Sequence, residues 1–576
     1  MTEEILTGYP SIDKPWLKKY YSDMIEKSIE PKTIYRNIYD NNKNHLNETA
    51  ILFKGFRINY GKMFDDTEKI ACALKAFGIG VGDVVNMCVS MVPEAVCLLL
   101  ACNKIGALAN FINPLFTTEQ KVELLNETDG KLLIILDAMF SYMEEAVPNI
   151  NMEKIVILPA VASLPLPIRL WANIKQKNER LSVFCRTSKK YLSWKKFLDS
   201  GNLFDDETEA AYESERPAVM VYSSGTTGAS KGIVLTNDGI CATISHYNSD
   251  EFIYDRGDTF LSIVPIWFST GNILCMLMPI CLGISVILEP VFNKENFVKD
   301  ILQYKPNMTL GATGLWTHLI HCVEAKNADM SFFKYPIIGG ERVLPEAEHK
   351  INVFLKKHNC VSSIIKGYGM CELGSTVTTT SAKHSKLESV GYPIKKVNIA
   401  AFDLVTNEEM PYGKRGELRV CSAAHMKGYF KNSQATEEFF KQDASGNLWG
   451  CTGDIGYVDE DGDVFICGRT SDCFIAEDGS CVYYFDIEAA ILEETAVMDC
   501  KTIQTEDKKL VAHIICGDSY SGKEDDLIKN LCARCEKLPC HARPTHYKLR
   551  DDFPVHANGK RDNESLRKDE ENLIRV

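Results

Sequence analysis

One stretch decides the fold of this chain: Tyr222-Ser223-Ser224-Gly225-Thr226-Thr227-Gly228-Ala229-Ser230-Lys231-Gly232. It follows the apolar run 218–221 and precedes a second apolar run, 233–235, so the pattern places it between two strands. Glycines and small hydroxyl side chains let the backbone approach a ligand and supply N–H and O–H donors for phosphate oxygens. Lys231 adds a mobile positive charge at the end of the stretch. The stretch therefore predicts a phosphate-binding loop.

Two other interpretations of this loop are less consistent with the sequence. In a Walker A loop a glycine precedes the lysine and a helix follows at once, whereas here Ser230 precedes Lys231 and an apolar strand follows. A flexible linker rich in serine and glycine rarely joins two apolar strands or ends in a lysine. The phosphate-binding interpretation is therefore retained.

Strands and helices alternate on the N-terminal side of the loop. Residues 50–53 and 56–60 predict a strand–turn–strand unit, and apolar residues between Met63 and Phe77 recur at helical spacing. A buried strand, 84–89, and a helix, 94–105, follow. This order predicts an α/β fold, with a large N-terminal domain built on mainly parallel sheets.

The composition changes after the polar turn 468–472, and the remaining residues predict a small α+β domain on a hinge. We expect two domains, an N-terminal domain of residues 1–470 and a mobile C-terminal lid domain of residues 471–576.

Composition excludes several classes of function. The 576 residues carry a formal net charge of −14, which argues against a nucleic-acid binder and against attachment to an anionic membrane. The first residues show no signal peptide. The longest apolar run, 273–288, contains Pro279 and Gly283 and is shorter than the roughly 20 residues that a spanning helix needs. We expect a cytoplasmic protein with no transmembrane segment.

Most of the 21 cysteines are scattered through apolar runs, where a free cysteine acts as a small buried hydrophobe. Cys532, Cys535, Cys540 and His541 form one cluster with spacing that suits zinc. A second ligand pair is missing, and residues 525–537 have the pattern of an amphipathic helix. A zinc site remains an alternative there.

Further motifs follow the loop in a fixed order. Gly339-Gly340-Glu341 comes directly after a predicted strand, and Gly367-Tyr368-Gly369-Met370-Cys371-Glu372 combines an aromatic face with a carboxylate suited to Mg²⁺. Thr452-Gly453-Asp454 offers a carboxylate that can accept from two neighbouring hydroxyls. Asn558-Gly559-Lys560 places an ammonium on a turn near the C-terminus.

These motifs together resemble the acyl-adenylate-forming superfamily, which includes acyl-CoA synthetases, adenylation domains of peptide synthetases and firefly-type luciferases. The resemblance runs from about residue 50 to residue 560, and the aromatic-rich start of the chain looks like bacterial fatty-acyl-CoA ligases. It implies that a carboxylate attacks the α-phosphorus of Mg-ATP, pyrophosphate leaves, and the acyl-adenylate then passes its acyl group to the thiol of coenzyme A.

The resemblance also assigns roles to residues. Lys560 would stabilise the transition state of adenylation, Glu372 would hold Mg²⁺, and Thr226 would hold the departing phosphates. Asp454 and Arg469 would contact the ribose, and Gly479 would line the thiol tunnel. The residues expected to contact ATP or coenzyme A are Ser223, Ser224, Gly225, Thr227, Gly228, Lys231, Gly339, Gly340, Glu341, Tyr368, Gly369, Met370, Cys371, Asp454, Arg469 and Gly479.

Three positions depart from the family pattern. Phe268 stands where many acyl-CoA members of the family have His. Cys371 stands where the family usually has threonine, and a thiol is a poorer donor to the α-phosphate than a hydroxyl. Ser471 stands at the hinge, where the family usually has Asp or Lys.

The acid is expected to be hydrophobic. Members of the superfamily that activate amino acids tend to carry Asp where this chain has Phe268, and an apolar wall would leave a buried ammonium unpaired. We expect Trp267, Phe268, Gly271 and Thr313 to form the substrate pocket.

Three alternatives remain open. A stand-alone adenylation enzyme would load an external acyl carrier protein instead of coenzyme A. A non-catalytic nucleotide-binding relative would bind ATP and act through partner contacts, and a luciferase-like oxidation is not excluded by the motifs. The sequence is compatible with a homodimer and does not specify the chain length of the acid.

Overall fold

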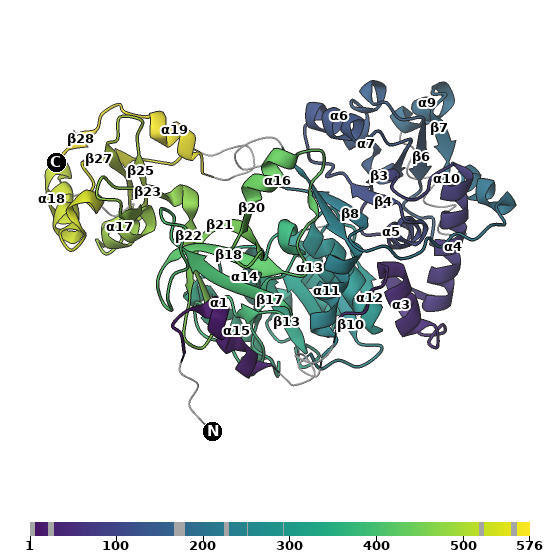
Figure 1. Cartoon of the computed structure of the whole chain (residues 1–576), viewed down its shortest axis with the longest axis horizontal. Coiled ribbons are helices and arrows are strands. Elements are labelled where there is room, and N and C mark those ends of the chain that lie inside the picture. The colour runs from purple at the N-terminus through teal and green to yellow at the C-terminus, as the bar shows by residue number, and fades with distance from the viewer. Residues whose placement is uncertain are drawn as a thin grey trace. The chain divides into compact units, whose positions relative to one another are not determined.

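The computed structural model describes residues 6–20, 28–165, 167, 179–223, 230–249, 252–291, 293–517, 523–554 and 561–576. The chain forms two compact units. Unit 1 comprises residues 1–399, 419–451 and 459–465, and unit 2 comprises residues 400–418, 452–458 and 466–576. Figure 1 labels many of the elements of both units.

An eight-stranded sheet of unit 1 carries the phosphate-binding loop. Its strand order is β19-β9-β8-β4-β3-β5-β6-β7, and the pairs from β8 to β7 are parallel, whereas β8–β9 and β9–β19 are antiparallel. β3, β4, β5 and β9 are buried along their whole length, as expected for strands covered on both faces. The strand bounds are β3 (Val84–Cys88), β4 (Leu108–Phe111), β5 (Leu132–Leu136), β6 (Lys154–Leu158), β7 (Tyr191–Ser193), β8 (Pro217–Tyr222), β9 (Gly232–Thr236) and β19 (Gly428–Tyr429).

A nine-stranded sheet of unit 1 carries the other motifs of the N-terminal region. Its order is β16-β15-β14-β13-β12-β10-β11-β1-β2, and the five pairs from β14 to β1 are parallel. The strand bounds are β1 (Thr49–Phe53), β2 (Phe56–Asn59), β10 (Thr259–Ser262), β11 (Ser285–Leu288), β12 (Met308–Gly311), β13 (Tyr335–Gly339), β14 (Ile365–Tyr368), β15 (Thr378–Thr379) and β16 (Tyr392–Pro393).

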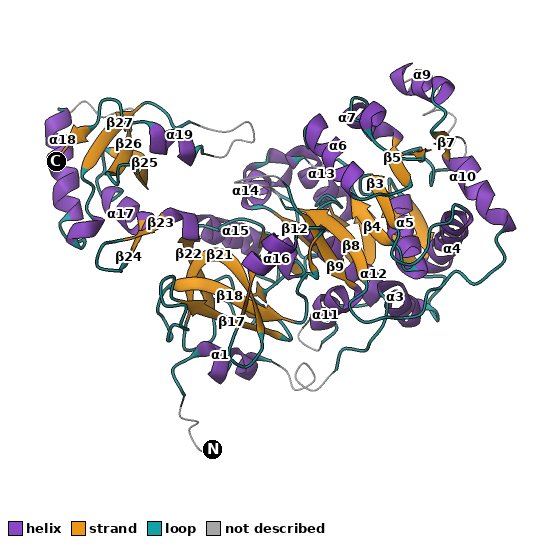
Figure 2. Ribbon diagram, turned by 45° about the horizontal axis from the view of Figure 1, so that its top comes forward, coloured by secondary structure: helices purple, strands orange, loops and turns teal. Residues whose placement is uncertain are grey.

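Helices pack on both sheets, as Figure 2 shows around β3, β4, β8 and β9. α6 (Thr118–Glu127) and α7 (Phe140–Met143) share a hydrophobic cluster with the eight-stranded sheet. α13 (Lys294–Tyr304), α14 (Thr313–His321) and α15 (Pro345–Lys357) share another with the nine-stranded sheet. Further helices of this unit are α3 (Ile34–Asn42), α4 (Tyr60–Ala76), α5 (Pro93–Ile105), α10 (Trp194–Ser200) and α11 (Asn237–Tyr247).

A π-helix, η5 (Thr270–Leu277), runs directly into α12 (Met278–Leu282). Both are apolar and buried, and they form the run 273–288 together with β11. π-helices are rare and are frequently found at functional sites. Within the described ranges, no helix is long and apolar enough to cross a bilayer.

A five-stranded sheet contains β17 (Val397–Phe402), β18 (Gly416–Ser422), β21 (Leu448–Val458) and β20 (Phe440–Gln442) in that order, with β22 (Val464–Arg469) paired to β21. The limits of the two units fall inside these strands.

Unit 2 also contains a two-stranded sheet, β23 (Cys473–Ile475) and β24 (Cys481–Tyr483), and a four-stranded sheet of β25 (Val497–Gln504), β26 (Leu510–Cys516), β27 (His546–Arg550) and β28 (Ile574–Arg575). α17 (Tyr484–Ile491) and α18 (Glu524–Cys535) pack on this sheet around one hydrophobic cluster. The predicted α/β class with mainly parallel sheets is confirmed.

Candidate active site

The phosphate-binding loop connects two antiparallel strands. β8 and β9 pair up to Tyr222 and Gly232, and the next residues on each side, Ser223 and Lys231, hold the ends of the loop together. The backbone N–H of Ser223 donates to the carbonyl of Lys231 (3.1 Å), and the N–H of Lys231 donates to Ser223 Oγ (3.2 Å). The predicted ligands Ser224, Gly225, Thr226, Thr227 and Gly228 lie outside the described residues.

The side chain of Lys231 meets a residue that the sequence motifs did not single out as functional. Its ammonium lies 4.9 Å from the ring centroid of Tyr429, and the Tyr429 hydroxyl donates to Glu372 Oε1 (3.0 Å). Burial, followed by the charge of Glu372, raises the pKa of Tyr429, so this hydroxyl stays protonated and acts as a donor. Tyr429 therefore links the loop lysine to the carboxylate expected to hold Mg²⁺.

Glu372 fits a magnesium ligand chemically. It is only 8% exposed, it belongs to the turn 371–373, and it presents the hard carboxylate oxygens that Mg²⁺ prefers. One of these oxygens is already fixed by Tyr429. Among the described residues, no group of three or more His, Cys, Asp or Glu side chains is arranged to hold a metal ion by itself. This agrees with the tendency of Mg²⁺ to be bound by one or two carboxylates together with substrate phosphates.

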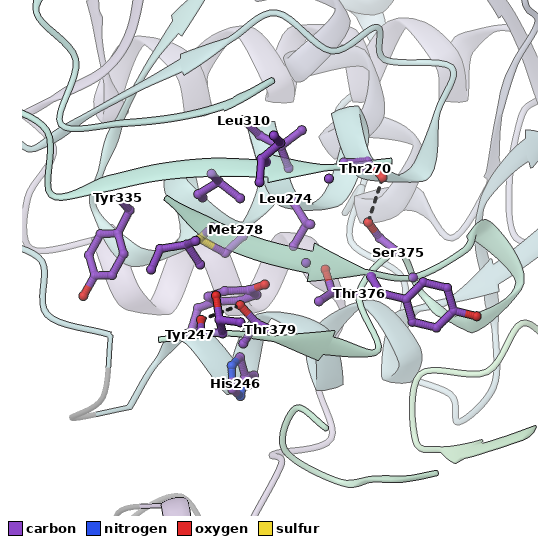
Figure 3. Close-up of a pocket in the computed structure, with 18 of the residues that line it drawn as sticks. His246, Tyr247, Thr270, Leu274, Met278, Leu310, Tyr335, Ser375, Thr376 and Thr379 are labelled. Atoms are coloured by element: carbon purple, nitrogen blue, oxygen red, sulfur yellow. Dashed lines mark hydrogen bonds between the residues drawn. The ribbon is translucent and has the colours of Figure 1, made fainter. Parts of the chain in front are cut away.

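A cavity opens at the carboxyl ends of β12, β13 and β14. Open parallel sheets commonly bind ligands at this edge. Figure 3 shows Leu310, Leu274 and Met278 gathered above Tyr247, Thr379 and His246. The lining combines aliphatic, aromatic and small polar residues: His246, Tyr247, Ser249, Phe252, Phe260, Thr270, Leu274, Met278, Leu310, Tyr335, Ile337, Ile338, Gly339, Gly340, Ile365, Gly367, Tyr368, Gly369, Ser375, Thr376, Thr379, Thr380 and Ser381.

Gly339, Gly340, Tyr368 and Gly369, which were predicted to contact ATP or coenzyme A, all line this cavity. Two of the glycines are required by the backbone. Gly340 has φ +88°, and a Cβ on Gly369 would lie 1.8 Å from the carbonyl oxygen of Ser375. The two motifs therefore bring main chain close to the cavity at the ends of adjacent strands. Met370 continues the second motif, and its carbonyl accepts hydrogen bonds from Leu373 N–H and Ser375 N–H.

The cavity contains one buried histidine, and this histidine is neutral. His246 Nδ1 accepts from the backbone N–H of Lys395 (3.2 Å), and burial lowers the pKa of His246 to about 3. A neutral imidazole provides no charge to pair with an ionised group on the substrate. The lining is thus suited to an uncharged acyl group.

The expected pocket residues Trp267, Phe268, Gly271 and Thr313 are not among the described residues that line the cavity. Trp267 is buried, Phe268 is 36% exposed, and a Cβ on Gly271 would lie 2.2 Å from the carbonyl oxygen of Pro265. Thr270, Leu274 and Met278 line the cavity instead, four residues apart on η5 and the start of α12. All three therefore lie on the side of η5 and α12 that faces the cavity.

Thr313 and Glu341 are brought together at a different point. The backbone N–H of Thr313 donates to Glu341 Oε1 (2.7 Å) at the start of α14. A carboxylate is favoured at a helix N-terminus because it accepts from unpaired backbone donors and complements the helix dipole. In this structure Glu341 therefore stabilises the start of α14.

Cys371 lies beside a serine hydroxyl. Ser269 Oγ donates to Cys371 Sγ (3.0 Å), and Ser269 is almost fully buried. Burial, followed by the charge of Glu372, raises the pKa of Cys371, so the thiol stays protonated and is a poor nucleophile.

Replacing Cys371 with threonine restores the hydroxyl that the family usually carries here. We expect kcat/KM for ATP in acid-dependent ATP–pyrophosphate exchange to rise about fivefold, since one hydrogen bond contributes about 1 kcal/mol. Cys371→Val has the shape of threonine without the hydroxyl and is the matched control. Equal rates for the Thr and Val variants would show that the hydroxyl makes no contact with the nucleotide.

Within unit 2, the structure brings Asp454 and Arg469 together. Arg469 Nη1 lies 3.0 Å from Asp454 Oδ1 and also donates to the carbonyl of Thr452 (3.4 Å). Gly479 has φ +84° in the hairpin between β23 and β24, a conformation that favours glycine. Lys560 lies outside the described residues.

The cysteines of the zinc alternative have other contacts. Cys535 Sγ accepts from the hydroxyl of Tyr547 (3.7 Å), and His541 lies against Asp478 (3.3 Å) and Ser480 (3.1 Å). Cys535 is buried, whereas Cys540 is exposed. The described residues of this cluster therefore form no group of metal ligands.

Comparison with known proteins identifies the family. The AMP-binding enzyme family matches residues 38–430. The chain belongs to this family of AMP-binding enzymes. A long-chain-fatty-acid–CoA ligase of Bacillus subtilis (strain 168) is 27% identical, with 95% of this chain and 96% of the relative covered. A probable 4-coumarate–CoA ligase of Dictyostelium discoideum is 24% identical, with 84% of each chain covered.

The fold agrees with solved structures. The ATP-bound structure of MatB from Rhodopseudomonas palustris superposes with a TM-score of 0.73 at 19% identity, covering 93% of this chain and 99% of that chain. The resemblance inferred from the motifs is therefore confirmed. So is the prediction that the chain is an ATP-binding, AMP-forming acid–thiol ligase of the acyl-CoA synthetase class.

Proposed function

We propose that this enzyme activates a hydrophobic carboxylic acid, in the first place a fatty acid, and transfers the acyl group to coenzyme A. The observation that carries the proposal is the cavity beside the glycine motifs, which has Leu274, Met278 and Leu310 in its wall and a neutral histidine. Burying each methylene of an acyl chain there contributes about 0.8 kcal/mol. The fatty-acid ligase among the relatives supports the same substrate class.

In the proposed reaction the carboxylate of the acid attacks the α-phosphorus of ATP, and pyrophosphate leaves. Lys231 and the loop residues Thr226 and Thr227 hold the departing phosphates, and Lys560 offsets the charge that develops between carboxylate and phosphorus. Glu372 would hold Mg²⁺, which when bound neutralises charge on the phosphate oxygens. Asp454 and Arg469 would contact the ribose.

In the second half of the reaction a thiol sulfur attacks the acyl carbon of the adenylate and loses its proton, the bond between the acyl carbon and the phosphate oxygen breaks, and AMP leaves. We propose that residues 471–576 act as a mobile lid domain that removes Lys560 after adenylation, and that Gly479 lines the path of the thiol. An external carrier protein remains the alternative acceptor. The 4-coumarate ligase among the relatives keeps aromatic acids as the second substrate class.

The experiment that tests the proposal is acid-dependent ATP–pyrophosphate exchange over a panel of fatty, aryl and amino acids, followed by chromatography of the products with coenzyme A. We expect exchange with fatty acids, a weaker signal with aryl acids and none with amino acids, together with an acyl-CoA product. Exchange without an acyl-CoA product would favour a carrier-protein acceptor. Binding of ATP without exchange for any acid would contradict the proposed function and favour the non-catalytic alternative.

A further inference from the structure

A short segment of unit 1, residues 426–430, is fixed by backbone hydrogen bonds on two sides. The N–H of Met426 donates to the carbonyl of Glu372 (2.8 Å), whereas those of Lys427 and Phe430 donate to carbonyls of β9 (2.8 and 2.7 Å). We call residues 426–430 the strap. Because β9 begins directly after the phosphate-binding loop, the strap joins the loop to the turn that carries Glu372.

The orientation of Tyr429 within the strap is fixed as well. Its ring packs edge-on against Phe439 at 6.2 Å between centroids, and its backbone N–H donates to Thr436 Oγ1 (2.9 Å). The preceding Gly428 has φ +149°, and a Cβ there would lie 2.9 Å from Thr436 Cγ2. A glycine is therefore needed at this point for the strap to pack against α16 (Ser433–Phe439).

Tyr429 contacts two opposite charges through two different parts of its side chain. The ring face meets the ammonium of Lys231 at 4.9 Å, and the hydroxyl donates to Glu372 Oε1 at 3.0 Å. Phenylalanine could make only the first contact, because it has no hydroxyl, and a serine hydroxyl is too close to the backbone to reach Glu372. Tyrosine is thus the side chain that can make both contacts.

We propose that Tyr429 is a positioning residue that keeps the metal-binding carboxylate of Glu372 and the phosphate-binding ammonium of Lys231 apart and correctly oriented. A direct ion pair between these groups would neutralise the charges that ATP and its metal need. A cation–π contact is weaker than a charge-assisted hydrogen bond to phosphate, so the ring can release Lys231 when a polyphosphate arrives. This inference rests on the proposed function, because that function assigns Mg²⁺ to Glu372.

Two variants of the full-length protein distinguish the roles of these two contacts. Tyr429→Phe keeps the ring under Lys231 and removes the donor to Glu372, whereas Tyr429→Leu removes both contacts. Tyr212→Phe removes another tyrosine–carboxylate hydrogen bond, to Asp238 of the same unit, and is the matched control. Glu372→Gln reports on the metal site itself.

The readout is Mn²⁺ binding, followed by electron paramagnetic resonance of free Mn²⁺ in the presence of a non-hydrolysable ATP analogue. For Tyr429→Phe we expect the half-saturating Mn²⁺ concentration to rise about fivefold, the effect of one hydrogen bond, with analogue affinity in EDTA within about twofold of the wild type. Tyr429→Leu should weaken both metal and analogue binding. Tyr212→Phe should change neither.

Three outcomes would overturn the inference. If Glu372→Gln weakens Mn²⁺ binding and Tyr429→Phe does not, the proposed metal site stands and the role of Tyr429 falls. If Tyr429→Phe and Tyr212→Phe have equal effects, the hydroxyl has only a structural role. If Glu372→Gln also leaves Mn²⁺ binding unchanged, the assignment of the metal to Glu372 fails together with the inference. Thermal unfolding midpoints near that of the wild type confirm that the variants are folded.

Discussion

Replacing Lys560 with alanine is expected to lower kcat for acid-dependent ATP–pyrophosphate exchange by about 10²–10³, the usual cost of losing one preorganised charge or donor at a developing oxyanion. The ammonium is proposed to act on charge that exists mainly in the transition state. Its loss should therefore reduce kcat and kcat/KM together and leave the affinity for ATP largely unchanged. Single-turnover formation of the acyl-adenylate measures this directly.

The matched control is Lys529→Ala, which removes an exposed lysine from α18 in the same unit. It should have wild-type activity. A second control uses synthetic acyl-adenylate with coenzyme A, because the thiol transfer does not need Lys560 in the proposed mechanism. If Lys560→Ala slows both half-reactions equally, the residue is not specific to adenylation and the assignment is incorrect.

The local motifs of this chain predicted where the main chain meets the cavity. Gly339-Gly340 and Tyr368-Gly369 each lie at or directly after the end of a strand, and a strand followed by glycine is visible in the sequence. Adjacent parallel strands end at the same edge of a sheet, so the two motifs lie side by side once β13 pairs with β14. For such features, the local sequence pattern and the fold class together are sufficient to predict where the residues lie.

Contacts that depend on pairing between distant segments were not predicted. The strap lies outside the motifs that the sequence assigned to the site, and the hydrogen bond from Tyr429 to Glu372 arises only because β19 pairs with β9. The hydrophobic periodicity of these two segments does not indicate that they pair.

The residues expected to form the substrate pocket show a different limit of sequence-based prediction. The sequence pattern favoured Trp267 and Phe268 because they stand at the family's pocket motif, whereas Thr270, Leu274 and Met278 are the residues of the following helices that line the cavity. The helix that follows is a π-helix, in which i→i+5 hydrogen bonds change the residues that share a face. An apolar run is compatible with either helix type, so hydrophobicity alone cannot specify which residues face the acid.

The wall residue Leu274 provides the sharpest test of the substrate class. It is 8% exposed, lines the cavity between Thr270 and Met278, and lies opposite Tyr247 and Thr379 in Figure 3. Leu274→Trp should fill part of the cavity and exclude the far end of a long acyl chain. If four methylenes of the acyl chain can no longer be buried, the binding free energy lost is about 3 kcal/mol. This corresponds to a decrease of roughly 200-fold in kcat/KM for the longest acid that the wild type accepts.

Acids four methylenes shorter should be used by Leu274→Trp nearly as well as by the wild type, and the KM for ATP should not change. Leu274→Ala removes the same side chain without adding volume and should extend the accepted chain length, at a stability cost of about 2–5 kcal/mol. A uniform loss of activity for all chain lengths in Leu274→Trp, with normal thermal stability, would place the acyl chain elsewhere. Because the cavity wall contains aliphatic side chains and a neutral histidine, we expect the chain-length-dependent result.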